Sequence, residues 1–157
     1  MPQNFVQAVI DNVKTLVSNL ETFQTIVDAE DATEALDSIY FMDAEDDGSD
    51  PIPRAIVGIE PPLTRVKSSS SGWSTSQLTI WIAVEVPIPG AVTGYAARDR
   101  WFAGLVEGLL NDLESISGTG TYLALRSITI EEIAVFAKPE MNEGAEFMTC
   151  YFTGEVE

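Results

Sequence analysis

The acidic stretch at residues 43–53 could bind calcium, because acidic residues alternate there before a glycine. The positions concerned are Asp43, Glu45, Asp47 and Gly48. Such alternation of oxygen ligands before a glycine turn forms the first half of a calcium-binding loop. The second half does not fit, since Arg54 stands where the ion needs a bidentate glutamate. We therefore interpret residues 43–53 as a solvated acidic loop and expect no metal site.

Two pairs of carboxylates could serve as general acid and base, Glu131 with Glu132 and Asp112 with Glu114. A chain with 25 acidic residues contains such pairs by chance, and no glycine-rich phosphate-binding motif accompanies them. The chain also has no histidine, the commonest general base and metal ligand. We therefore expect no catalytic residues, no cofactor and no enzymatic activity.

Cys150 is the single cysteine of the chain, which excludes an internal disulfide and a thiolate zinc site. It lies in a predicted strand, on the side that is expected to face the helices. A lone cysteine in that position is most often a small core residue rather than a nucleophile.

The 157-residue chain is strongly acidic, with 8 Lys plus Arg against 25 Asp plus Glu and a net charge of −17. This charge repels phosphate groups and disfavours sequence-specific binding of DNA or RNA. Half of the positive residues lie in two small groups, Arg65 with Lys67 and Arg98 with Arg100. We predict that these groups dock an acidic neighbour or another copy of the chain. Ordinary surface ion pairs are the alternative for each residue taken singly.

Several aromatic residues are expected on surfaces rather than in the core. Trp73 lies in a serine-rich loop, and Trp81 points away from the aliphatic row of its strand. Phe147 and Tyr151 fall on the same far face by alternation. Two interpretations stay open: these side chains make local covering contacts, or they anchor a partner that docks on this face.

The hydrophobic periodicity predicts three helices and four strands. The helices are expected at residues 4–20, at 32–39 with Asp31 as the cap, and at 95–117 with Gly118 as the stop. The strands are expected at 54–60, which residues 63–67 could continue, at 78–86, at 122–136 with a bulge near Ser127, and at 145–156.

This order of elements predicts one α+β domain over residues 1–157, with a four-stranded, mainly antiparallel sheet and the helices packed on one face. The expected parts of this domain are the N-terminal helices 4–40, the acidic loop 43–53, a strand hairpin 54–87, a core helix 95–117 and C-terminal strands 122–156. No stretch reaches about 20 continuous apolar residues, so no membrane span or membrane partner is expected. Residues 1–25 lack the pattern of a targeting signal, which favours the cytoplasm at synthesis.

The whole pattern resembles the tail completion or tail terminator proteins of long-tailed bacteriophages. The resemblance covers nearly the whole chain and rests on element order and two phrases, FQTIVDAEDATEALDSIYF at residues 23–41 and PRAIVGIE at 53–60. It implies a virion structural protein that forms a ring, usually of six copies, at the head-proximal end of the tail tube. Such a ring stops tube polymerisation, contacts the tube protein and the head–tail connector, and lets DNA pass without specific binding.

Two other functions remain open on the residues alone. One keeps the phage setting but places the ring elsewhere in the neck, as a head-closure or tail-tube component. The other is a monomeric acidic protein that mimics DNA and inhibits a DNA-binding host factor, which the charge of −17 would suit.

Overall fold

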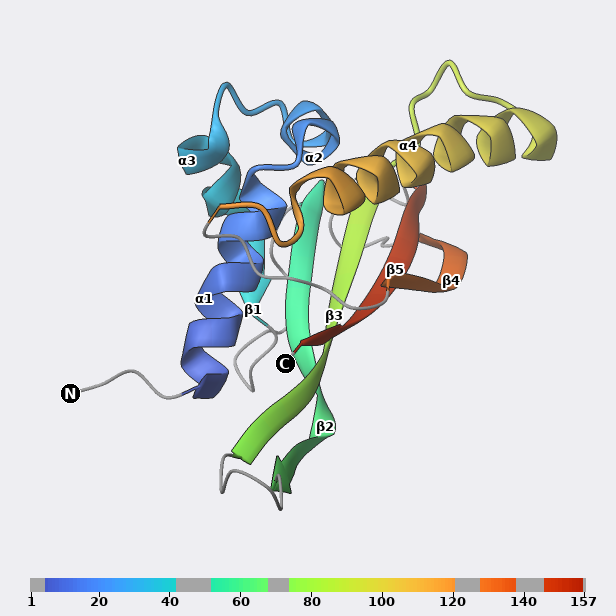
Figure 1. The fold of residues 1–157 in the computed structure, drawn as a ribbon. Helices are drawn as coiled ribbons and strands as arrows, with labels where there is room; N and C mark the ends of the chain where they lie inside the picture. The colour runs from blue at the N-terminus through green and yellow to red at the C-terminus, as the bar shows by residue number, and fades with distance from the viewer. Residues whose placement is uncertain (1–4, 42–51, 68–73, 121–127, 138–145, 157) are drawn as a thin grey trace.

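The computed structural model describes residues 5–41, 52–67, 74–120, 128–137 and 146–156, and they form an α+β fold (Figure 1). The helices are α1 (Phe5–Ser18), α2 (Glu21–Ile26), α3 (Ala32–Ala35), the 3₁₀ turn η1 (Leu36–Ser38) and α4 (Tyr95–Ile116). The strands are β1 (Ile39–Phe41), β2 (Arg54–Lys67), β3 (Ser74–Pro87), β4 (Ile128–Ala137) and β5 (Glu146–Val156). The α+β class is confirmed.

The sheet has five strands in the order β1-β2-β3-β5-β4, so the predicted count of four is corrected. The additional strand, β1, pairs in parallel with residues 55–57 of β2, and all other neighbours are antiparallel. Ile39 belongs to β1 and not to the helix predicted at 32–39. A three-residue strand gives almost no periodic signal of its own, and it forms here because β2 offers an open edge.

The helix predicted at residues 4–20 corresponds to α1, and the short helix α2 that follows it is not among the predicted elements. Helix α1 ends at Ser18, and Leu20 is extended before α2 begins. The side chains of Ser18 and Asn19 donate to the backbone oxygen of Thr15, in competition with continued helical hydrogen bonds.

Helix α3 begins as predicted but is shorter. The Asp31 side chain accepts a 2.9 Å hydrogen bond from the backbone N–H of Glu34, and the Glu34 carboxylate accepts one from the N–H of Glu30. This reciprocal capping confirms the predicted helix start.

Strand β2 continues through its two prolines to Lys67, although a stop at Pro61 was predicted as one possibility. The pairing with β3 changes register between Glu60 and Thr64, which accommodates the missing N–H groups of Pro61 and Pro62. In β4 an irregularity lies between Ile130 and Glu132, and the bulge predicted near Ser127 falls on residues that the structure does not describe. Residues 121–127 lie outside the described part of the chain.

The core lies between the sheet and the long helices, which cross the same face of the sheet (Figure 1). Alternate residues of β3 face this core, in agreement with the predicted alternation. The β3 residues are Leu78, Ile80, Ile82, Val84 and Val86. Helix α4 adds Phe102, Val106, Leu109 and Leu113, and Gly118 takes the left-handed conformation expected after it, with φ of 76°.

Candidate functional site

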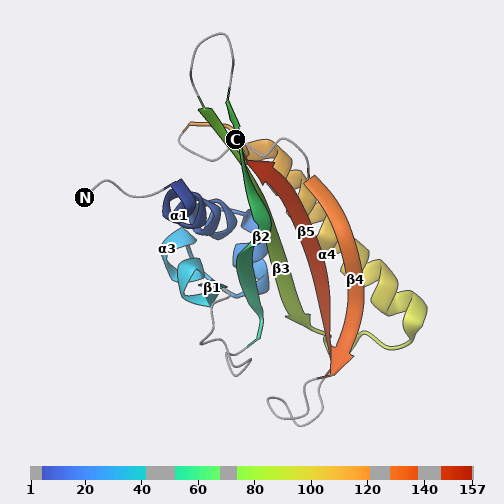
Figure 2. The same ribbon diagram turned by 90° about the horizontal axis from the view of Figure 1, so that it is seen from below.

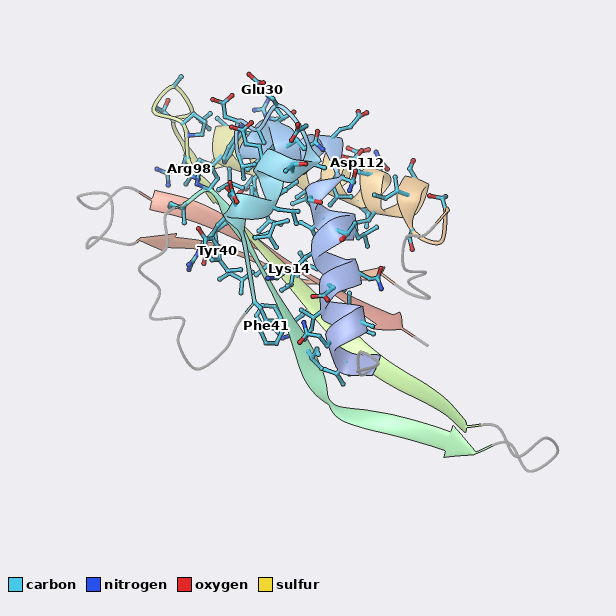
Figure 3. All side chains as sticks on the ribbon, turned by 90° about the vertical axis from the view of Figure 1, so that its left-hand side faces the viewer. Lys14, Glu30, Tyr40, Phe41, Arg98 and Asp112 are labelled. Carbon is cyan, nitrogen blue, oxygen red and sulfur yellow. The ribbon has the colours of Figure 1, made fainter. Side chains whose placement is uncertain are left out.

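The outer ends of β2 and β3 form a two-stranded arm that extends beyond the rest of the sheet. The arm consists of residues 64–67 and 74–77, which pair antiparallel from Thr64–Gln77 to Lys67–Ser74. The pairs of β3 with β5 begin at Leu78, and those of β2 with β1 end at Val57. Among the described residues the arm therefore has no third strand, and Figure 3 shows it projecting past the first turn of α1.

Both edges of this arm leave backbone N–H and C=O groups without a strand partner in the described part of the chain. A ribbon of two strands is only marginally stable in water, and open edges readily accept another strand. The arm also carries Arg65 and Lys67, two of the eight basic residues, and no acidic residue. It is thus a cationic segment on a chain of net charge −17.

Trp81 lies on the sheet face opposite the core, and its indole ring covers Gly58 of the neighbouring strand. A Cβ atom on Gly58 would overlap Cε2 and Cζ2 of Trp81, so only glycine admits the ring in this position. Trp81 is half-buried, and Gly58 is buried beneath it. This is the local covering contact of the first interpretation, and a role of Trp81 as an anchor for a partner stays a prediction.

The same face holds a buried ion pair between Arg54 and Glu85. Arg54 Nε donates to Glu85 Oε2 at 2.6 Å, and the two side chains are only 3% and 12% exposed. The residues are direct cross-strand partners in the register of β2 and β3. This pair is not among the residues predicted from the sequence, although the antiparallel register of the hairpin places the two residues opposite each other.

The second basic group lies elsewhere. Arg98 and Arg100 belong to the first turns of α4, where Arg98 is half-buried and Arg100 exposed. Figure 1 shows α4 across the top of the sheet and the ends of β2 and β3 below it, so the fold keeps Arg65 and Lys67 apart from this group.

The predicted aromatic cluster is placed only in part. In β5, Phe147 pairs with Pro87 and Tyr151 with Ala83, so the two residues occupy positions beside the strand of Trp81. Cys150 pairs with Val84, a core residue. Trp73 lies outside the described residues.

The carboxylates of Asp112 and Glu114, which the sequence analysis considers as a chance pair, lie in different surroundings in the structure. Asp112 Oδ2 accepts a 2.8 Å hydrogen bond from the backbone N–H of Thr22 and so caps α2, whereas Glu114 is exposed. Gly108 allows this close approach, because a Cβ there would meet the Thr22 hydroxyl oxygen at 2.7 Å.

No metal site is found within the described ranges, where no three acidic or cysteine side chains converge. Residues 43–48 of the acidic loop fall outside these ranges, and Arg54 is held by Glu85. No described helix is long and apolar enough to cross a bilayer.

No protein-family model and no curated protein sequence matches the chain. Among solved structures, one similar chain belongs to the virion of a native gene transfer agent particle. The two chains share 12% sequence identity and a TM-score of 0.43, with 96% of this chain and 98% of that chain covered.

Proposed function

We propose that this protein is a structural component of a phage-like virion, which forms a ring at the head-proximal end of the tail tube. There it terminates tube polymerisation and joins the tail to the head connector. The chain acts through surfaces and not through catalysis. The observation that carries this proposal is the projecting arm at residues 64–67 and 74–77, together with the sequence resemblance.

The arm supports assembly because, among the described strands, its two halves pair only with each other and leave both outer edges open. A cationic ribbon of two strands gains stability when it contacts another subunit. When an arm contacts a different patch on the next copy, the contact is heterologous, the type of contact from which rings are built when the rotation between copies closes.

The charge suits the lumen of a ring through which DNA passes. Six copies at −17 each would carry on the order of −100 charges, and DNA phosphates would be repelled from such a surface. DNA then moves through the ring without adhering to it.

The test is deletion of the gene from the genome that encodes the particle, followed by electron microscopy. We expect overlong tails or tails that are not joined to heads, and complementation should restore normal particles. Tails of normal length on normal heads in the deletion strain would contradict the proposal. The copy number per intact particle separates a single terminating ring from a stacked tail-tube component, and a position between portal and connector would indicate head closure.

The net charge of −17 also favours a second candidate, an acidic DNA mimic. That function predicts a monomer which binds a basic host protein with an affinity that falls steeply with added salt. Absence of the protein from purified particles, combined with such binding, would favour the mimic over the ring.

A further inference from the structure

We infer that the arm of one subunit adds to the outer edge of β4 in the next subunit, so that the ring closes through intermolecular β-sheet pairing. This inference rests on the proposed ring and identifies the two surfaces that meet in it. Its basis is that one chain carries both an open cationic ribbon and, at a separate place, an open acidic strand edge.

Strand β4 is the longer of the two edges of the sheet. It stands last in the order β1-β2-β3-β5-β4 and spans 10 residues, whereas β1 at the other edge spans 3. In the described part of the chain β4 pairs only with β5, so its outer backbone groups face no strand (Figure 2). An edge of this length can hydrogen-bond an added strand along several residues.

The charges select which strand can be added. The register irregularity of β4 lies at Glu131 and Glu132, the two charged residues of that strand. Pairing of β4 with β4 of another copy would bring these carboxylates together, and like charges across strands are unfavourable. Among the described strand residues only Arg54, Arg65 and Lys67 are basic, and Arg54 is buried with Glu85. The arm is therefore the strand pair of this chain that complements the β4 edge.

The fold directs this contact to a second copy. The arm belongs to β2 and β3, and β5 lies between β3 and β4, so the arm and the β4 edge lie apart within one subunit. A contact between two different patches is heterologous, and repeated from copy to copy it gives a ring when the rotation between copies closes and an open filament when it does not.

Charge reversal gives a sharp test. R65E/K67E makes the arm acidic and changes the net charge from −17 to −21, and E131K/E132K makes the β4 edge basic and changes it to −13. Each variant alone places like charges across the contact, so we expect self-association at least about 100-fold weaker than that of the native chain. In an equimolar mixture every acidic arm can meet a basic edge and every basic arm an acidic edge, so association should return.

The measurement is sedimentation velocity at about 0.15 M salt, where the general repulsion between copies is screened beyond about 8 Å, with far-UV circular dichroism as the check that each variant is folded. The fourfold variant R65E/K67E/E131K/E132K is the matched control. Its net charge is again −17, and its acidic arm complements its basic β4 edge. It should associate as the native chain does.

The outcomes separate this inference from the proposed function. If the native chain forms rings and both twofold variants also form them, the arm–β4 contact is wrong and the ring remains. If the two twofold variants are monomeric, and neither their mixture nor the fourfold variant associates, the effect is structural and the inference is also overturned. A native chain that stays monomeric to millimolar concentration contradicts the inference and argues against the ring itself.

Discussion

Gly58 and Trp81 occupy neighbouring positions on the sheet face away from the helices, and the size of one determines the position of the other. The ring of Trp81 lies where a Cβ of residue 58 would be. Glycine normally weakens a strand, so its presence in the middle of β2 has a specific reason here. That reason is the space it leaves for the indole.

We expect Gly58→Ala to destabilise the protein by about 1–3 kcal/mol, because the new methyl group displaces the indole. In a Trp81→Val background the same substitution should be neutral or stabilising by about 0.5 kcal/mol, since alanine suits a strand better than glycine. Urea unfolding of the four variants measures this coupling. Equal effects of Gly58→Ala in both backgrounds would contradict the overlap.

The ion pair of Arg54 and Glu85 is buried, so the loss of one partner should cost more than the loss of both. Arg54→Met leaves the Glu85 carboxylate in a dry environment, and we expect a loss of about 3–5 kcal/mol. The double variant Arg54→Met/Glu85→Met should be more stable than Arg54→Met alone. Arg100→Met removes the same charge from an exposed position and should change stability by less than about 0.5 kcal/mol. Thermal unfolding ranks these variants, and a double variant less stable than Arg54→Met would contradict the argument.

At the scale of elements, the short helix α2 depends on a residue 90 positions away in the sequence. The residue before its first turn, Leu20, provides no side-chain cap, and Asp112 of α4 supplies the acceptor instead (Figure 3). A carboxylate at this end of a helix also interacts favourably with its dipole.

Asp112→Ala should therefore destabilise the protein by about 1 kcal/mol, which lowers Tm by roughly 3 °C for a chain of this size. Asp112→Asn should recover part of the loss, because the amide oxygen can still accept the hydrogen bond from Thr22. Glu114→Ala, an exposed change of equal charge on the same helix, is the matched control. Calorimetry that finds equal Tm values for Asp112→Ala and Glu114→Ala would exclude the cap.

The elements that the sequence predicts well are those with strong local signals. The alternation of β3 and the periodicity of α4 identify both elements and their core faces. The short elements were missed because tertiary contacts create them: α2 needs the cap from Asp112, and β1 needs the edge of β2. The candidate site also combines a local signal with a tertiary one. The charges of Arg65 and Lys67 can be read from the sequence, whereas the strand register is needed to show that no third strand lies beside them in the described residues.

At the scale of the whole molecule, the charge of −17 opposes both folding and assembly. Like charges repel each other most strongly in the compact state, and the repulsion between copies adds to this in a ring. Salt reduces these long-range terms, because the Debye length falls from about 30 Å at 0.01 M to about 8 Å at 0.15 M. A short contact between complementary charges, such as the proposed arm and β4 edge, is screened less when it is partly buried.

We therefore expect the Tm of the monomer to rise by roughly 3–6 °C between 0.01 and 0.2 M NaCl, which corresponds to about 1–2 kcal/mol. The variant Asp28→Asn/Glu107→Gln/Glu114→Gln changes the net charge from −17 to −14 at three exposed positions. Asparagine tolerates the positive φ of Asp28, 56°, so the backbone should be unchanged. This variant should melt at a higher temperature in low salt and respond less to added NaCl. Scanning fluorimetry at a concentration where sedimentation finds monomer tests both effects, and identical salt responses of the two proteins would show that local ion pairs, rather than net charge, govern the stability.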